Sequence, residues 1–138
     1  MGVNVFPATT SKTRYHTTLT SGTSWTVPAG VTYVNVTLCG AGGGGDTSGY
    51  EGKGGMVVTS TLSTTPGASI TYAIGAGGSS AAGGSTTFTG ATTATGGNTA
   101  SGSGATTRNY SSNGGTSNSL AAPAKDGGNG QIDIEYWL

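Results

Sequence analysis

A strand that runs without a break into a glycine run constrains this chain more than any other feature. Over residues 25–45 the sequence is WTVPAGVTYVNVTLCGAGGGG. Val34, Val36 and Leu38 alternate with other residues, and a period of two is typical of a strand with one buried face. The glycines of residues 42–45 have no side chain to bury. We therefore expect a small β core that holds side-chain-poor loops outward.

The composition indicates one folded domain with little charge. The chain has 138 residues, an ordinary length for one domain. It contains 28 glycines, whereas glycine usually makes up about 7% of a protein. Charged residues make up 7%, against a usual share of about 25%. Disordered chains usually have a high net charge, but here the formal net charge is zero and the apolar residues cluster in alternating runs.

The charge pattern argues against nucleic acid as a partner. Binding to DNA or RNA needs a concentrated basic surface, and the five basic residues are scattered: Lys12, Arg14, Lys53, Arg108 and Lys125. No stretch approaches the roughly 20 apolar residues of a membrane helix. The N-terminal residues lack the basic and apolar regions of a secretory signal, so we expect synthesis in the cytoplasm. The sole cysteine, Cys39, leaves the redox compartment open.

Alternating apolar residues between glycine and proline turns predict an all-β fold. No segment has a helical period, and the pattern favours a small antiparallel β-sandwich with long Gly-, Ser- and Thr-rich loops. Residues 21–138 are expected to form this glycine-rich β domain, and residues 1–20 an N-terminal arm and first strand that dock on the body or a partner. The docking residues of the arm would be Val3, Val5 and Phe6. The predicted strands are 14–20, 24–27, 31–39, 56–62, 70–74, 86–88, 91–95 and 131–138.

One glycine motif matches the pattern of a dinucleotide site. Gly40, Gly42 and Gly45 fit G-x-G-x-x-G directly after a strand. Such a site needs a helix that opens at the third glycine and an acidic residue about 20 positions later. Here DTSGYEGKGG follows without a helical pattern, and Thr64 or Thr65 stands in the place of the acid. We therefore expect no cofactor.

The residues that could perform catalysis are few. His16 is the only histidine, and on its Thr-rich strand a solvated or packed side chain is favoured over a base. Cys39 lacks basic neighbours that would depress its pKa and is expected to be a small buried hydrophobe. Asp133 and Glu135 share one strand face, about 6 to 7 Å apart, which borders on an inverting glycosidase pair. A solvated edge-strand face, which would also discourage aggregation, is favoured. We predict no catalytic residue, no metal site and no enzymatic activity.

The large side chains of the glycine-rich loops form the remaining candidate site. Tyrosine among serine, glycine and asparagine is the chemistry of antibody paratopes, where rigid amphipathic contacts lie beside adaptable hydrogen-bonding groups. Two alternatives stay open: Tyr50 and Tyr110 could fold back on the core, and the loops could pack against neighbouring subunits. The predicted receptor-binding residues are Tyr50, Glu51, Lys53, Arg108, Tyr110, Asn113 and Asn118.

Several segments together resemble the glycine-rich domain of bacteriophage tail fibres and adhesins. They are TVPAGV, VNVTLCGAGGGG, TLSTTPG, GAGG, TATGG and the closing GGNGQIDIEYW, in the family's order over residues 25–137. Some members of that family stack glycine stretches as polyglycine II helices, since the missing Cβ lets backbones approach closely. The glycine runs here are short, so the sequence leaves this packing open. No long shaft precedes the domain, which leaves room for a free-standing virion component.

The resemblance implies a bacteriophage virion structural protein with a fibre-tip-like surface that binds the host cell. The expected partners are other virion proteins, further copies of the chain (a trimer, because fibre ends are threefold), and a host surface glycan or outer-membrane protein. The protein would be made in the host cytoplasm and lie on the virion surface. An alternative is a capsid decoration or cement protein, or a head fibre, docked through the arm; removal of residues 1–13 discriminates the two. An ice-binding protein is a third class, but no regular Thr-x-Thr repeat supports it.

Overall fold

Seven strands and no helix form in the part of the chain that the computed structural model describes, residues 11–45, 52–99 and 126–138. The arm residues Val3, Val5 and Phe6 lie outside these ranges. The predicted all-β fold class is confirmed. The strands are β1 (Arg14–Leu19), β2 (Ser24–Thr26), β3 (Tyr33–Cys39), β4 (Val57–Ser63), β5 (Ser69–Ala73), β6 (Thr87–Phe88) and β7 (Gln131–Trp137).

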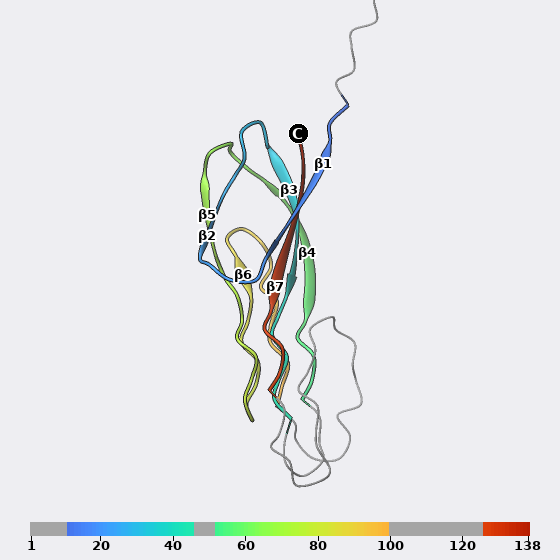
Figure 1. The fold of residues 1–138 in the computed structure, drawn as a ribbon, viewed down its shortest axis with the longest axis vertical. Coiled ribbons are helices and arrows are strands. Elements are labelled where there is room, and N and C mark those ends of the chain that lie inside the picture. Colours follow the sequence, from blue (N-terminus) through green and yellow to red (C-terminus); the bar gives the residue numbers. More distant parts are fainter. Residues whose placement is uncertain (1–10, 46–51, 100–125) are drawn as a thin grey trace, which may run out of the picture.

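The strands form two antiparallel sheets that pack as a small sandwich (Figure 1). The larger sheet has the order β1-β7-β3-β4 and the smaller one β2-β5-β6. β7 therefore lies inside its sheet, paired with β3 on one side and along its length with β1 on the other. The prediction of an edge strand at the end of the chain is wrong, because the distant strand β1 covers the edge that this strand would otherwise expose.

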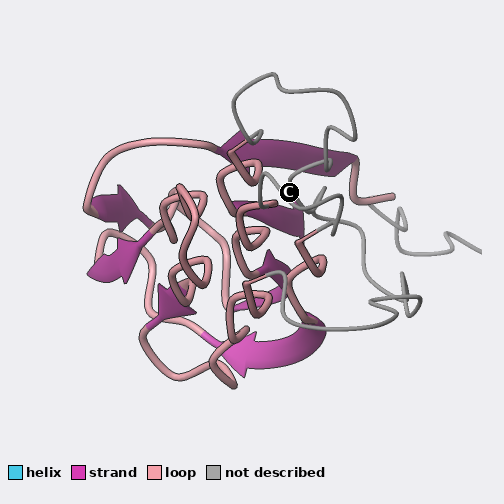
Figure 2. Cartoon of the chain, turned by 90° about the horizontal axis from the view of Figure 1, so that it is seen from below, coloured by secondary structure: helices cyan, strands magenta, loops and turns pink. Residues whose placement is uncertain are grey.

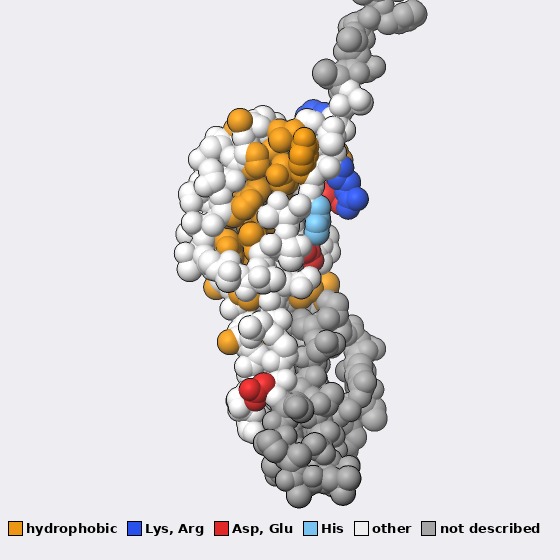
Figure 3. Space-filling model, in the orientation of Figure 1, with side chains coloured by type: hydrophobic (Ala, Val, Ile, Leu, Met, Phe, Trp, Pro, Cys, Tyr) orange, Lys and Arg blue, Asp and Glu red, His pale blue; other side chains and the backbone are white. Residues whose placement is uncertain are grey.

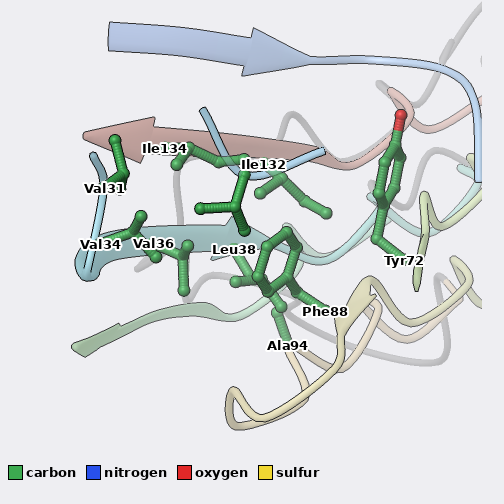
Figure 4. Packing of buried hydrophobic residues seen from close by; sticks show 10 residues of the cluster. Val31, Val34, Val36, Leu38, Tyr72, Phe88, Ala94, Ile132 and Ile134 are labelled. Carbon is green, nitrogen blue, oxygen red and sulfur yellow. The ribbon is translucent and has the colours of Figure 1, made fainter. Parts of the chain in front are cut away.

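The core lies between the sheets, where the alternating residues of β3 point inward (Figure 4). Val34, Val36 and Leu38 are each 0% exposed, as their spacing predicted. Ile132 and Ile134 of β7 lie beside them and are also fully buried. The smaller sheet adds aromatic rings, so that the two inner faces share one apolar cluster.

The threonine-rich run 91–95 differs from its predicted strand. Only Ala94 pairs, in an isolated bridge with Thr86, and the Thr92 N–H donates to the Ser60 hydroxyl at 3.4 Å instead of joining a ladder. The chain turns at Gly90, where φ is +91°. The chain then passes from the sandwich to the glycine-rich segments. Threonine favours strands, but this run has no neighbouring strand with which it could form a ladder.

Candidate functional site

Residues 40–45, which we call the central segment, directly follow β3 and are buried throughout. Their amide groups donate to neighbouring segments in a repeat of three. Gly40 and Gly43 donate to residues of 52–56, Ala41 and Gly44 to residues of 81–84, and Gly42 to residue 128. The bonds are Gly40 N–H to Met56 O (2.8 Å), Ala41 to Gly84 (3.0 Å), Gly42 to Gly128 (2.9 Å), Gly43 to Lys53 (2.8 Å) and Gly44 to Ala81 (2.9 Å).

This repeat identifies the local geometry, because a polyproline II or polyglycine II helix has three residues per turn and no internal hydrogen bonds. The carbonyl groups of the segment add two more neighbours, since Gly78 donates to Gly42 O and Gly97 to Ala41 O, at 2.9 and 2.8 Å. The central segment is therefore enclosed by five others. We call the six together the glycine bundle: residues 40–45, 52–56, 75–78, 81–84, 95–98 and 127–130. Figure 2 looks along the bundle, whose segments appear as small coils seen end-on.

The bundle is packed mainly by backbone. A Cβ added to Gly40 would overlap the carbonyl of Thr95, and one added to Gly43 would overlap the carbonyl of Asn98. Such approaches bring Cα–H groups against carbonyl oxygens, a weak but recurrent contact. The same lack of room holds at Gly52, Gly55, Gly77, Gly83, Gly96, Gly97 and Gly127.

A sequence signal for the bundle exists. Glycines three residues apart occur in four of its segments, as Gly40–Gly43, Gly52–Gly55, Gly75–Gly78 and Gly127–Gly130. Burial follows the same period, since Gly75 and Gly78 are buried and Ala76 between them is exposed. A period of two indicates strands, whereas these segments have a period of three. The short runs pack because several lie side by side.

Hydrogen bonds define the end of the bundle that lies away from the strands. Gly43 bonds to Lys53, Lys53 N–H donates to Asn98 O at 3.1 Å, and Gly127 N–H donates to Gly78 O at 2.9 Å. The described chain stops within two residues of these bonds, at Gly45, Gly52, Thr99 and Asp126, and these four residues mark what we call the distal end. Figure 1 shows this end of the molecule below the strands. Segments 46–51 and 100–125 therefore both begin and end there.

One predicted receptor-binding residue, Lys53, lies within the described chain. It is half-buried at the distal end and lines a groove with Met56 and Asn98, between residues 53–56 and 95–98. The other six predicted residues lie outside the described ranges: Tyr50, Glu51, Arg108, Tyr110, Asn113 and Asn118. All six belong to the two segments that begin and end at the distal end.

The first two glycines of G-x-G-x-x-G, Gly40 and Gly42, do not offer their amides to a ligand. A pyrophosphate site needs free N–H groups at the opening of a helix. The Gly42 N–H is bonded to Gly128 O at 2.9 Å and the Gly40 N–H to Met56 O at 2.8 Å. The described residues on either side of 46–51 are in extended, non-helical backbone. This motif is part of the bundle.

A polar cluster lies on the outer face of the larger sheet, where β1 and β7 are neighbours. This pairing joins strands from opposite ends of the chain and could not be predicted from local sequence patterns. His16 Nε2 lies 3.5 Å from an Asp133 carboxylate oxygen, and the Arg14 guanidinium pairs with Glu135, with Nε at 2.6 Å from Oε2. These side chains line a shallow groove together with Asn35, Thr37 and Thr59. Figure 3 shows basic, histidine and acidic side chains side by side at this edge of the molecule.

The side chains of this cluster mainly bond to one another across neighbouring strands. The hydrogen bond from Arg14 lowers the pKa of Glu135 below its ordinary value of 4.5, whereas the general acid of a glycosidase needs a raised pKa. The Asp133 carboxylate accepts hydrogen bonds from the Thr18 hydroxyl at 2.7 Å and the Gln131 amide at 3.0 Å. Within the described ranges no three of His, Cys, Asp and Glu gather as a metal site would need. Cys39 is 5% exposed, as expected for a small buried hydrophobe.

Fold and site together define an all-β protein in which a sandwich is extended by an ordered bundle of glycine-rich segments. The family profile described as "Glycine-rich domain" matches residues 17–134, and the chain belongs to this family. Comparison with curated proteins gave no match. No helix in the described ranges is long and apolar enough to cross a membrane.

Proposed function

We propose that this chain is a non-enzymatic bacteriophage virion protein that binds the host cell surface through the distal end of its glycine bundle. The observation in support is that the described residues flanking both segments with predicted receptor-binding residues lie together at that end: Gly45, Gly52, Thr99 and Asp126. The groove beside Lys53 adds polar and apolar contacts there. The ligand would be a host surface glycan or an outer-membrane protein.

The bundle suits this role because its backbone hydrogen bonds can hold recognition loops at a distance from the body. Backbone hydrogen bonds between six segments fix the positions at which the loops start and end. Tyrosine and asparagine on these loops would supply reversible contacts. Several copies on one virion would convert weak contacts into avidity, and the resemblance to fibre ends favours a trimer.

The opposite end of the molecule suits attachment to the particle. Thr13 and Leu138 bond to each other through both N–H groups, at 2.7 and 3.0 Å, beside β1 and β7. The start of β1 therefore lies at the end of the molecule away from the bundle (Figure 1). This position also favours the second candidate, a capsid decoration or head-fibre protein docked through the arm.

Cell adsorption tests the proposal. The double variant Tyr50→Ala/Tyr110→Ala is expected to abolish binding of purified protein to host cells while its circular dichroism spectrum stays that of the wild type. Tyr33→Ala is the matched control, because Tyr33 is 43% exposed but lies at the start of β3, away from the bundle. Unchanged adsorption of the double variant would refute the adhesin function.

Removal of residues 1–10 separates the two candidates and leaves the Thr13–Leu138 bonds in place. Loss of particle attachment with intact cell binding would show an arm-docked component that also binds cells. If the truncated protein loses particle attachment and the full-length protein does not bind cells, the decoration protein is favoured.

A further inference from the structure

The four edges of the two sheets differ in how they are protected. Natural edge strands avoid pairing with other chains by being short or by bearing charge or proline. β2 and β6 have three and two residues, and β1 bears Arg14 and His16. β4 has seven residues, VVTSTLS, with neither charge nor proline. It is the unprotected edge of the described sheets.

The backbone groups that β4 directs outward follow from the ladder. The bonds from Thr64 N–H to Thr32 O (2.8 Å) and from Gly40 N–H to Met56 O (2.8 Å) flank the β3–β4 register. In an antiparallel pair, residues alternate between bonding to the partner and facing away. The even-numbered residues of β4 therefore bond to β3, and the N–H and C=O groups of Val57, Thr59, Thr61 and Ser63 face away.

In the described chain this outward side has no partner strand. The neighbouring segment 95–98 reaches only Met56, the residue before β4, whose N–H donates to Thr95 O at 2.9 Å. Within β4 the Thr92 N–H donates to the Ser60 hydroxyl at 3.4 Å, a bond to a side chain and not to the outward backbone groups. The side chains of Thr59 and Thr61 are exposed on the outer face of the sheet, bonded to Thr37 and Asn35 of β3 at 3.2 and 2.7 Å. A strand of another chain can therefore pair with the outward side of β4 without displacing any strand of the described residues.

The sequence of β4 is nearly symmetrical about Ser60, as Val58-Thr59-Ser60-Thr61-Leu62. In an antiparallel pair of two such strands centred on Ser60, Thr59 lies opposite Thr61 of the second copy, and Val58 opposite its Leu62. The residues with outward backbone groups then face each other, as a hydrogen-bonded ladder requires. Threonine pairs and apolar pairs at opposed positions are favourable.

We propose that two copies of this chain associate through β4, antiparallel and about a twofold axis at Ser60. The two four-stranded sheets then join into one continuous sheet. A twofold contact uses the same patch on both partners, which the symmetry of the strand provides. This contact is independent of the proposed function. It differs from the threefold association that the resemblance implies, and it could join two copies that belong to different trimers.

Sedimentation equilibrium of the full chain over a wide concentration range measures the association. The expected result is a concentration-dependent dimer. A monomer at every concentration, or association in which no variant of β4 changes the mass, would overturn the proposal.

Charge substitutions test the register. Thr59→Lys/Thr61→Lys places lysines opposite each other twice, and should weaken association about tenfold, because opposed like charges destabilise a strand pair. Thr59→Lys/Thr61→Glu places lysine opposite glutamate in the same register and should restore it. Equal dimerisation of the two variants, or loss in both, would contradict the pairing about Ser60.

A proline substitution tests the backbone contribution. The Thr59 N–H faces away from β3, so Thr59→Pro removes an outward donor and leaves the ladder with β3 intact, as edge-strand proline does. It should be monomeric, with a thermal unfolding temperature close to that of Thr59→Val, which loses the same hydroxyl but keeps the N–H and should still dimerise. A dimeric proline variant would refute pairing at this edge.

Discussion

Gly43 shows at the scale of one residue what holds the bundle together. Its N–H bonds to Lys53 O at 2.8 Å, and a Cβ in its place would overlap the backbone carbonyl of Asn98. A backbone carbonyl in a hydrogen-bonded segment cannot move aside as a flexible side chain can. Glycine is therefore required at position 43 by the lack of space for a side chain.

Gly43→Ala should lower the free energy of unfolding by about 3 kcal/mol, the upper part of the range for overpacked sites. Gly67→Ala is the control. Nothing lies within 4 Å of a Cβ there, but φ is +79°, so the cost should be only about 1–2 kcal/mol from left-handed backbone. Urea denaturation measures both. Equal or reversed losses would mean that residue 43 is not tightly packed.

Glu135 illustrates the effect of a cross-strand charge. Its pKa in the folded protein is held below 4.5 by the hydrogen bond from Arg14. A lowered folded pKa adds stability that is present above the unfolded pKa and is lost as pH falls through the folded one. In Arg14→Gln the pKa of Glu135 should rise toward 4.5, and stability should decline less between neutral and acidic pH.

NMR titration of the Glu135 carboxyl measures that pKa directly, and urea denaturation at pH 7 and pH 3 measures the stability. Lys12→Gln is the matched control, since it removes a positive charge that is not bonded to Glu135. If Arg14→Gln leaves the pKa of Glu135 unchanged, the ion pair does not persist in solution.

At the scale of elements, the shortest strand makes a large contribution to the core. β6 has two residues, yet Phe88 is 1% exposed and its ring lies 6.3 Å from that of Trp25 and 6.5 Å from that of Tyr72. It thus joins the strands of the smaller sheet to the shared apolar cluster.

Phe88→Ala should lower the free energy of unfolding by about 3–5 kcal/mol, as expected when a buried aromatic side chain leaves a cavity. Its exposed neighbour in the same strand provides the control, and Thr87→Ala should change stability by less than about 0.5 kcal/mol. Thermal unfolding followed by tryptophan fluorescence compares them. A small effect of Phe88→Ala would mean that the two sheets do not share one core.

The elements that could be predicted are those that a sequence pattern within the element itself defines. The alternation of Val34, Val36 and Leu38 gave β3 and its buried face, because side chains of a strand have a period of two. The interior place of β7 could not be predicted, since it depends on pairing with residues 14–19 at the far end of the chain. The contacts of His16 and Arg14 with the acidic residues depend on that same pairing. Polyglycine II packing stays open from the sequence alone, because its signal is a spacing of three between residues without side chains.

At the scale of the whole molecule, β3 joins the two parts directly. Its last residue, Cys39, is followed by the central segment, so one continuous chain passes through the core of the sandwich and the middle of the bundle. Thr86 lies where the parts meet. It is 0% exposed and its hydroxyl accepts the Gly75 N–H at 3.0 Å. Sandwich and bundle should therefore unfold together.

Amide hydrogen exchange followed by NMR tests this account most directly, because protection reports the free energy needed to open each hydrogen bond. The amides of Gly42 and Gly43 should be protected to the same order as that of Val36 in β3, in spite of their place in a run of glycines. Exchange of Gly42 and Gly43 at the rate of an unfolded chain, with Val36 still protected, would show that the glycine segments do not form a bundle.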